Sequence, residues 1–306
     1  MGLLIVGTVA LDSVETPFGK ADRVLGGSGT FASFAASFFS VPKLVGVVGE
    51  DFPESYLELL RSRAVDTAGV VKEKGKTFYW AGKYETDVNV RTTLTTELNV
   101  LQTFNPVIPE KFRDSSYLFL ANIDPKLQLK VLDQCSGLKF TVMDTMNYWI
   151  ENTREALDRV LGRVDAVLLN DEEARMLTGT PVLQKAADSI LKSFPSMKIV
   201  IIKKGEHGAM MFSREGFFAL PGYPLDVVKD PTGAGDSFAG GFIGWISRAD
   251  STDEVTLRQA VAAGSATASF CCEDFSVDRF RTLDSSELKR RAASIRNCTE
   301  FASLDW

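Results

Sequence analysis

The sequence predicts an α/β fold with a mainly parallel central sheet flanked by helices and a small inserted β-sheet. Near-continuous apolar runs, such as Leu3–Val9 and Leu44–Gly49, are typical of strands buried on both faces of a sheet. Helical segments follow these runs, and this alternation of strand and helix predicts parallel pairing. Residues 69–104 interrupt the alternation with β-branched and aromatic stretches, which indicate antiparallel strands.

The composition excludes several classes of function. The net charge of −6 argues against a nucleic-acid-binding surface as the main function. No apolar run approaches the ~18 residues needed to span a membrane. The apolar stretch after Met1 has no basic residue before it, so it indicates a buried strand and not a signal peptide.

Cysteine and histidine usage narrows the chemistry further. The only histidine, His207, argues against catalytic triads and multi-histidine metal sites. The cysteines show neither metal-site nor disulfide-framework spacing, which favours a cytoplasmic, reducing compartment. They are Cys135, Cys271, Cys272 and Cys298.

The first predicted strand, Leu3–Val9, is followed by groups suited to holding a ligand. Asp12 comes just past its end, where open α/β sheets bind ligands, although a turn or a helix cap is an alternative. Gly26 and Gly27 precede a predicted helix at Phe31–Ser40 and indicate a backbone that closely approaches a ligand.

Later strands also end in polar residues. Tyr117–Ala121 ends at Asn122, and Phe140–Met143 ends at a polar cluster that begins with Asp144. An apolar strand stops at Asn170, and Glu173 follows at the start of a helix. This last pattern predicts a helix cap with a capping box.

The C-terminal half continues the alternation. The strand Ile199–Ile202 leads into a turn with the pattern Gly205-x-x-Gly208, which an ordinary β-turn would also explain. Further strands are expected at Phe217–Leu220 and Leu225–Val228, and later helices at Thr256–Phe270 and Leu283–Ile295.

The strongest functional signal begins at Asp230-Pro231. This pair breaks the preceding extended stretch, because the residue before proline is disfavoured in the α region. Gly233-Ala234-Gly235 then opens a helix. Asp236, Gly240 and Gly244 share one face of that helix.

Such a helix start suits phosphoryl transfer. Its unpaired N–H groups and partial positive charge attract anions, and glycines let a phosphate approach closely. Asp236, in the first turn, can take the proton of a hydroxyl while the N–H groups hold the developing charge. Tight packing against a sheet is the alternative. The turn is not a dinucleotide-binding fingerprint, because Phe238 stands where that motif has its third glycine. It is not a P-loop either, because it contains no Gly-Lys-Ser/Thr.

The stretch Asp230–Phe242, Asp-Pro-Thr-Gly-Ala-Gly-Asp-Ser-Phe-Ala-Gly-Gly-Phe, resembles the signature of the ribokinase-like (PfkB) family of carbohydrate and nucleoside kinases. The resemblance implies one ribokinase-like domain over residues 1–306. It also implies transfer of the γ-phosphoryl group of Mg-ATP to a hydroxymethyl group of a sugar or sugar-containing small molecule. Asp236 is then the general base. The N–H groups of Ala234, Gly235 and Asp236 then form the anion hole, and Gly233 opens this catalytic turn.

The resemblance also implies substrate contacts. Asp12 would hold sugar hydroxyls, with Gly26, Gly27 and Asn122 at further contact positions. Where the family has an asparagine four positions after the second glycine, this chain has Phe31. An aromatic residue there weakens the expectation of ribose or fructose phosphate. It offers a stacking surface for a base, so an adenosine- or inosine-like nucleoside kinase stays an alternative.

Cofactor positions follow from the same resemblance. Asn170 and Glu173 match the pair that positions Mg²⁺, with Glu173 acting through water. Asp230, with the loop from Cys271 onward, matches a site for a potassium-like cation (K⁺). The ATP-binding positions are Asn170, Lys203, Gly205, Gly208 and Gly235.

In the resembling family, strands inserted at approximately 69–104, with the chain near 14–24, form a lid over the substrate and in some members a homodimer interface. Trp80, Tyr84 and Arg91 are therefore candidates to face the substrate, with a place in the lid core or on its surface as the alternative for each. A non-catalytic ligand-binding module on the same fold is the alternative from a different class, against which the intact Asp236 argues.

Overall fold

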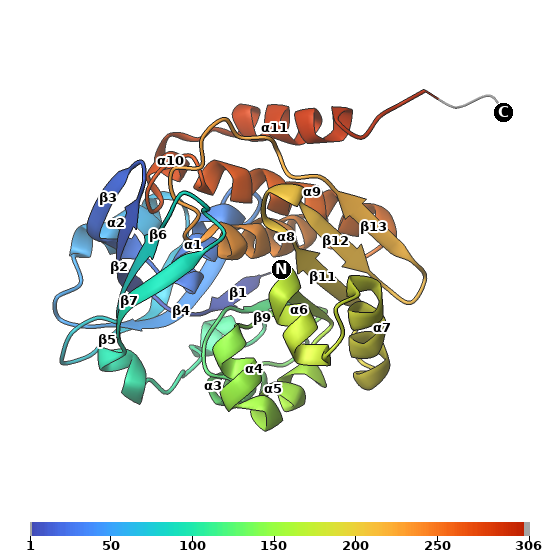
Figure 1. Cartoon of the computed structure of the whole chain (residues 1–306). Helices are drawn as coiled ribbons and strands as arrows, with labels where there is room; N and C mark the ends of the chain where they lie inside the picture. Colours follow the sequence, from blue (N-terminus) through green and yellow to red (C-terminus); the bar gives the residue numbers. More distant parts are fainter. Residues whose placement is uncertain (1, 303–306) are drawn as a thin grey trace.

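The computed structural model describes residues 2–302 and is built around a nine-stranded sheet (Figure 1). β12, next to one edge, pairs in antiparallel with both of its neighbours, β11 and β13, and all other neighbours pair in parallel. In spatial order the strands are β13 (Phe217–Leu220), β12 (Ala209–Phe212), β11 (Ile199–Lys203), β10 (Ala166–Asn170), β9 (Phe140–Asp144), β8 (Tyr117–Leu120), β1 (Leu3–Val6), β4 (Pro42–Val48) and β5 (Asp66–Lys72).

Helices cover both faces of this sheet, because successive side chains of its strands point to opposite sides. On β1, Leu3 and Ile5 join one core cluster and Leu4 and Val6 join the other. The first cluster is covered by α1 (Ser28–Ala36), α2 (Glu54–Ser62), α8 (Ala234–Ala249), α9 (Glu254–Cys271), α10 (Asp278–Thr282) and α11 (Ser285–Asn297). The second is covered by η1 (Asn99–Thr103), η2 (Glu110–Phe112), α3 (Pro125–Leu132), α4 (Asn147–Asn152), α5 (Arg154–Leu161), α6 (Asp171–Thr178) and α7 (Leu183–Ser193).

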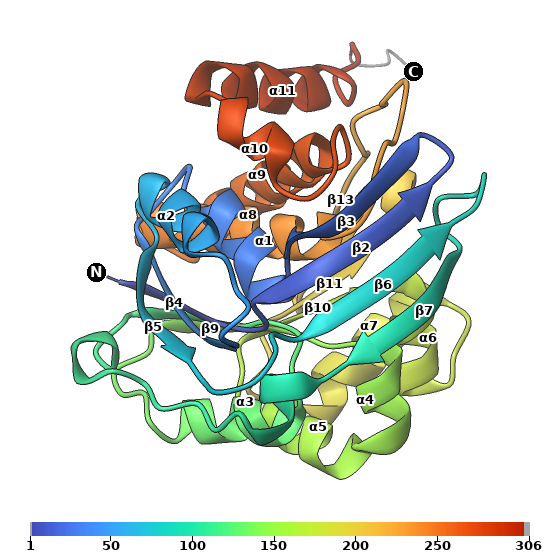
Figure 2. The ribbon, with the colours of Figure 1, turned by 90° about the vertical axis from the view of Figure 1, so that its left-hand side faces the viewer.

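A second, four-stranded sheet lies across one end of the large sheet (Figure 2). β2 and β6 pair in parallel at its centre, and both outer pairs are antiparallel. Because β2 follows β1 after a short loop, this small sheet is attached at the carboxyl end of β1. Its strands are β3 (Gly19–Gly26), β2 (Ala10–Thr16), β6 (Tyr79–Tyr84) and β7 (Arg91–Glu97).

The predicted fold class is confirmed, with three corrections to the expected strands. Leu3–Val9 is not one strand, because the chain leaves the large sheet after Val6 and enters the small sheet at Ala10. Residues 69–72 of the expected insertion belong to β5, which pairs with β4 in the large sheet. Leu225–Val228 forms a loop after β13, since it pairs with no strand of the described chain.

The glycine face predicted for α8 is a packing surface. A Cβ atom on Gly240 would lie 2.1 Å from the carbonyl oxygen of Ala32, and one on Gly244 would lie 2.9 Å from the Cα atom of Ala36. Both neighbours belong to α1, so the two helices approach backbone to backbone. This contact fixes the position of the start of α8.

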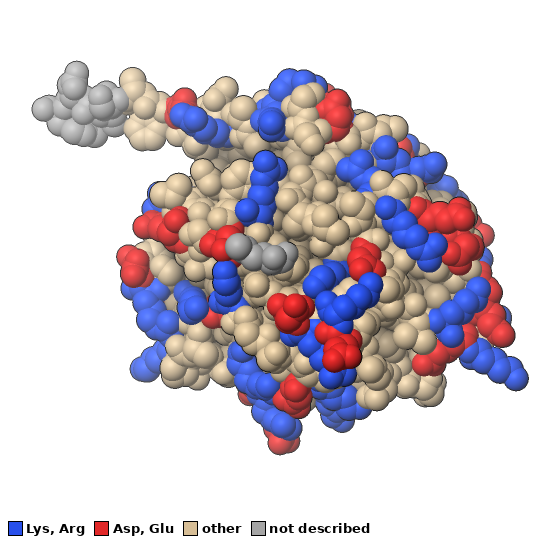
Figure 3. All heavy atoms as spheres, turned by 180° about the vertical axis from the view of Figure 1, so that it is seen from behind, with Lys and Arg blue, Asp and Glu red and all other residues tan. Residues whose placement is uncertain are grey.

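The outer surface carries charges of both signs. Seen from behind, Lys and Arg side chains lie beside Asp and Glu side chains over most of the visible face (Figure 3). None of the helices within residues 2–302 combines the length and the hydropathy that crossing a membrane requires.

Candidate active site

The centre of the candidate site is the start of α8. Gly233 caps this helix in the left-handed region, with φ of 78°, which favours glycine. A Cβ atom on Gly233 would also lie 2.4 Å from the ring of Phe31. The turn therefore requires glycine both for its backbone angle and for its contact with α1.

The N–H groups of this turn differ in their partners. Ala234 N–H donates to the carbonyl of Pro231 over 3.2 Å, so it is partly engaged inside the turn. Among residues 2–302 the N–H group of Gly235 has no acceptor, and that of Asp236 has none apart from its own carboxylate. Of the predicted anion-hole donors, these two are free to bind a phosphate oxygen.

Asp236 lies half-buried in the first turn of α8. Burial raises the pKa of its carboxyl group to about 7, and the charge of Asp144 adds to the increase. Lys203 and Arg91 act in the opposite direction. A carboxylate with a pKa near neutrality is suited to accept a proton from a hydroxyl group.

Lys203, at the end of β11, lies next to this turn. Its Nζ atom donates to Oδ2 of Asp144 over 3.0 Å, and a Cβ atom on Gly235 would lie only 3.1 Å from Nζ. Burial works to lower the pKa of Lys203, but the charges of Asp144 and Glu173 outweigh it and the pKa is raised. A charged ammonium group therefore lies beside the free N–H groups.

The predicted capping box joins β10 to α6. Glu173 N–H donates to Oδ1 of Asn170 over 2.7 Å, and Asn170 N–H donates to Oε2 of Glu173 over 2.8 Å. Burial raises the pKa of Glu173 to about 7, Asp144 adds to the increase, and Lys203 opposes it. Within residues 2–302 no three His, Cys, Asp or Glu side chains converge on one metal position. The oxygen donors fit Mg²⁺ bound through water, because this ion usually keeps several waters and few protein ligands.

Asp12 faces the site from the small sheet. A Cβ atom on Gly26 would lie 1.9 Å from Oδ2 of Asp12, so Gly26 leaves the space that this carboxylate fills. Burial raises the pKa of Asp12 to about 7, and the charges of Asp230 and Asp236 add to the increase. The N–H group of Gly27, which donates to this carboxylate, acts to lower the pKa. Asp12 and Asp236 thus lie close enough to interact.

Two residues expected to contact the substrate, Phe31 and Asn122, are engaged by other side chains or by the backbone of the protein. Phe31 is 2% exposed and its ring packs beneath Gly233, so in this arrangement it offers almost no surface to a base. Asn122 accepts a hydrogen bond at Oδ1 from Nε1 of Trp149 over 2.8 Å. Nδ2 of Asn122 is therefore the side-chain atom that is left to bind a substrate.

The small sheet brings Trp80 and Tyr84 to the site. Trp80 lies beside Asp12 in the pairing of β2 with β6, and its indole lies across Gly82, where a Cβ atom would be 2.1 Å from the ring. The hydroxyl of Tyr84 accepts a hydrogen bond from Oγ1 of Thr232 over 3.2 Å. Burial raises the pKa of Tyr84 to about 12, so the phenol stays protonated.

The Gly205–Gly208 turn lies where β11 meets β12. It forms the short helix η3 (Gly205–His207) and ends at Gly208 with φ of 88°. Asn89, from the β6–β7 connection, donates from Nδ2 to Oε2 of Glu206 over 3.2 Å. The small sheet therefore reaches this turn as well.

Asp230 lies beneath the turn and is 1% exposed. Its Oδ1 accepts from Thr232 N–H over 2.9 Å and its Oδ2 from Ser276 N–H over 3.4 Å. Burial raises the pKa of this carboxyl group more than these hydrogen bonds lower it. Asp230 thereby joins the turn before α8 to the loop that follows α9.

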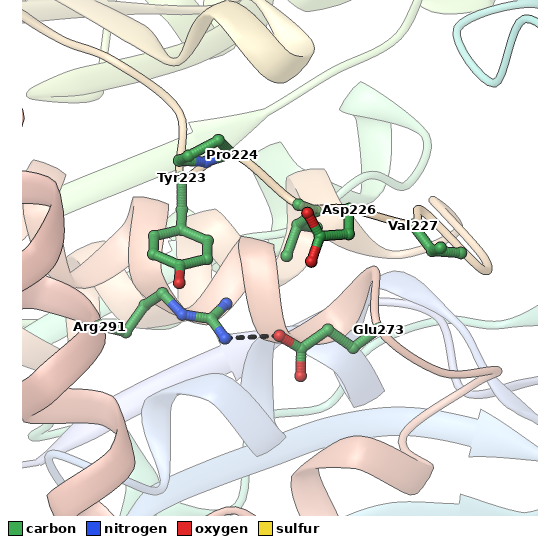
Figure 4. A pocket seen from close by; sticks show the side chains of 7 residues that line it. Tyr223, Pro224, Asp226, Val227, Glu273 and Arg291 are labelled. Carbon is green, nitrogen blue, oxygen red and sulfur yellow. Dashed lines mark hydrogen bonds and ion pairs between the residues drawn. The ribbon is translucent and has the colours of Figure 1, made fainter.

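A surface pocket of about 330 Å³ lies apart from these groups (Figure 4). Arg291 of α11 stacks 3.9 Å from the ring of Tyr223 and pairs with Glu273. Glu273 follows Cys272, whose carbonyl accepts the N–H group of Lys229 over 2.8 Å. None of the predicted site residues lines this pocket, and its ion pair supports the loop that precedes α8.

Sequence reasoning did not assign Asp144, Thr232 or Trp149 to the site. Asp144 had a signal, because it ends a buried strand at the same edge as Asn170. Thr232 lies inside the signature, but its contact with Tyr84 depends on the small sheet. Trp149 lies on α4, and no sequence pattern indicates its contact with Asn122.

Comparison with known proteins agrees with this geometry. The model of the pfkB family carbohydrate kinases matches residues 12–281. The cytidine kinase of Thermococcus kodakarensis is 34% identical over 260 residues, covering 83% of this chain and 91% of the relative. The ATP-dependent ribose-1-phosphate kinase of Halopiger xanaduensis is 28% identical over 255 residues, covering 79% and 80%.

A solved structure shares the fold. The nucleoside kinase of Burkholderia thailandensis in complex with inosine superposes with a TM-score of 0.79 at 18% identity, covering 97% of this chain and 99% of that one. The expected ribokinase-like fold is thereby confirmed. Since the family model spans most of the sequence and the cytidine kinase relative is matched over nearly its whole length, the chain belongs to the pfkB family of carbohydrate kinases and acts as a sugar or nucleoside kinase.

Proposed function

We propose that the chain transfers the γ-phosphoryl group of Mg-ATP to the 5′-hydroxyl of a nucleoside, with Asp236 as general base. The observation that carries this proposal is the position of Asp236. Its carboxylate, with a pKa of about 7, lies beside the free N–H groups of Gly235 and Asp236 and the ammonium group of Lys203. A base and an anion-binding turn at one point are what phosphoryl transfer to a hydroxyl requires.

The step is a simple displacement. A bond forms between the acceptor oxygen and the γ-phosphorus, and the bond from that phosphorus to the β–γ bridging oxygen breaks, so ADP leaves. The proton of the hydroxyl passes to Asp236. The N–H groups and Lys203 hold the phosphoryl oxygens, and Asn170 with Glu173 would position Mg²⁺, which neutralises phosphate charge when bound.

A nucleoside acceptor is supported by the small sheet. Asp12, which can accept hydrogen bonds from ribose hydroxyls, lies beside Trp80, whose flat indole lies across Gly82. An aromatic face next to the sugar-binding carboxylate suits a base, since stacking contributes about 1–3 kcal/mol per base. The cytidine kinase relative and the inosine-bound structural neighbour support the same substrate class.

The test compares nucleosides with free ribose for the wild type and Trp80→Leu. We expect KM for a nucleoside to rise roughly 5- to 150-fold, as loss of ~1–3 kcal/mol of stacking implies, with KM for ribose little changed. Phe18→Leu, which alters an exposed aromatic in the β2–β3 turn, is the control. Equal effects of Trp80→Leu on ribose and nucleoside would contradict the assignment of the base to Trp80.

Four further features belong to this proposal. We treat residues 1–306 as one kinase domain in which the small sheet acts as the lid. A monovalent cation such as K⁺ would bind near Asp230, at the junction of the two loops. β7, exposed along its length, is the surface through which two lids could pair in a homodimer. A cytoplasmic location is the last part of the proposal, and it is supported by cysteines that form no disulfide.

A further inference from the structure

Arg91 is a cation of the small sheet without an acidic partner. It is the first residue of β7 and is exposed. Within residues 2–302 it forms no ion pair and no side-chain hydrogen bond, unlike Lys83 on the neighbouring strand, which pairs with Glu85 over 3.1 Å. Its guanidinium lies over the ring of Trp80, 5.4 Å from the ring centroid.

Two contacts hold the backbone around Arg91 over the site. In the pairing of β6 with β7, Arg91 is directly opposite Tyr84, whose hydroxyl contacts Thr232 in the turn before α8. Just before Arg91 in the chain, Asn89 binds Glu206 in the turn after β11. Because opposite residues of an antiparallel pair point to the same face, Arg91 projects between these two turns.

The charges around this position favour a further cation. Asp144, Glu173 and Asp236 lie together with Lys203, and Asp144 already accepts its ammonium group. The positive charge of Arg91 lies near enough to lower the pKa values of both Asp236 and Glu173. A phosphate chain entering here brings more negative charge, which Lys203 alone would have to neutralise.

We propose that Arg91 is a catalytic residue that binds the transferred phosphoryl group from the side of the small sheet, opposite Lys203 and the start of α8. This assignment rests on the proposed function of Asp236. As the acceptor oxygen bonds to the γ-phosphorus and the bridging oxygen leaves with ADP, the guanidinium donates two hydrogen bonds to the phosphoryl oxygens. A planar guanidinium matches two such oxygens better than an ammonium group does.

The small sheet also holds Trp80 and Asp12, so acceptor binding and delivery of this cation are linked. An acceptor that contacts Trp80 and Asp12 holds the small sheet against the site and so holds Arg91 near the phosphoryl group. Without an acceptor, fewer contacts hold the small sheet in this position. Transfer to water should then be slow, because the cation is not fixed at the phosphoryl group.

The test measures acceptor-dependent ADP release by Arg91→Met, Arg91→Lys and the control Lys83→Met. Arg91→Met should lower kcat by ~10²–10³-fold, as loss of one transition-state donor typically does, while Mg-ATP binding followed by thermal shift is retained. Arg91→Lys should recover only part of kcat, since it lacks the two-pronged geometry. Lys83→Met should behave as the wild type, because it removes from the same sheet a cation that already pairs with Glu85.

Chemical rescue separates a direct role from a structural one. Adding methylguanidinium to Arg91→Ala should raise its kcat in a saturable manner and leave that of Lys83→Met unchanged. Wild-type kcat in Arg91→Met, or a loss that appears only in KM, would overturn the assignment. Failure of the proposed function would look different, since Asp236→Asn would then be as active as the wild type whatever Arg91 does.

Discussion

The ammonium group of Lys203 lies 3.0 Å from Oδ2 of Asp144, and the two residues end the strands on either side of β10. Asn170 ends β10 between them, so three polar side chains form a row at the carboxyl edge of the sheet. Asp236 faces this row from α8. The ion pair therefore sets the charge balance around the base, and it suggests the first prediction.

Lys203→Met should impair both stability and activity. Asp144 is 4% exposed and would be left buried without its partner, which typically costs about 3–5 kcal/mol of the free energy of unfolding. Loss of the cation beside the anion-binding turn should also lower kcat by ~10²-fold or more. Urea unfolding and ADP release measure the two effects.

Lys198→Met is the matched control, because Lys198 pairs with Asp165 at the surface and such pairs contribute only about 0–1 kcal/mol. The double variant Asp144→Leu with Lys203→Met should recover much of the stability but none of the activity. Full activity in Lys203→Met would show that its ammonium group does not contact phosphate.

The rate of transfer should depend on pH through Asp236. Its pKa is raised to about 7, and only the ionised carboxylate can accept the proton. kcat/KM for the acceptor should therefore rise from about pH 5.5, pass half of its maximum near pH 7, where the pKa of Asp236 lies, and level off above about pH 8. Asp12, whose pKa is also raised to about 7, should steepen the acidic limb. Asp12→Asn should make the rise of kcat/KM with pH less steep. A rate that does not change with pH over this range would contradict a carboxylate with a pKa of about 7 as the general base.

Glu173→Gln should separate the helix cap from the metal role. Glutamine can still accept the N–H group of Asn170, so the free energy of unfolding should change by less than about 1 kcal/mol. Loss of the charge should raise the Mg²⁺ concentration needed for half-maximal rate about 10-fold or more. Glu172→Gln, one residue earlier and exposed, should leave the Mg²⁺ titration unchanged. An unchanged titration for Glu173→Gln would remove this residue from the metal site.

The parts predicted well from sequence are those encoded locally. The apolar runs before Asn122 and Asn170 specify buried parallel strands, and the spacing from Asn170 to Glu173 specifies the capping box that the structure contains. The glycine turn before Asp236 likewise specifies an α8 with open N–H groups. In each case the residues that decide the structure are neighbours in the chain.

Contacts between distant segments could not be predicted in this way. The aromatic residue at Phe31 suggests a stacking surface for a base, but the absence of a Cβ atom on Gly233 lets its ring pack beneath the turn. The pairing of Asp144 with Lys203 depends on the order of β9, β10 and β11. The prediction of a strand at Leu225–Val228 is wrong, because β-branched residues favour a strand only where another strand is available to pair with.

Gly240→Ala should destabilise the protein through one contact. Its Cβ atom would lie 2.1 Å from the carbonyl oxygen of Ala32, which belongs to a buried backbone that cannot move freely. Overpacking of this kind costs about 1–3 kcal/mol, and the displaced start of α8 should also lower kcat. Gly162→Ala is the control, because its Cβ atom would be 3.5 Å from its nearest neighbour. Equal melting temperatures for the two variants would contradict the close packing of α1 and α8.

The central claim is that Asp236 removes a proton from a nucleoside 5′-hydroxyl during phosphoryl transfer. It is tested most directly by following ADP and nucleoside monophosphate together for the wild type and Asp236→Asn, with nucleosides and their 5′-deoxy analogues as acceptors. We expect equal amounts of both products from the wild type, none with the 5′-deoxy analogues, and a rate ~10²–10⁴-fold lower for Asp236→Asn with Mg-ATP binding intact. Near wild-type turnover in Asp236→Asn, or ADP release with the 5′-deoxy analogues at the same rate, would contradict it.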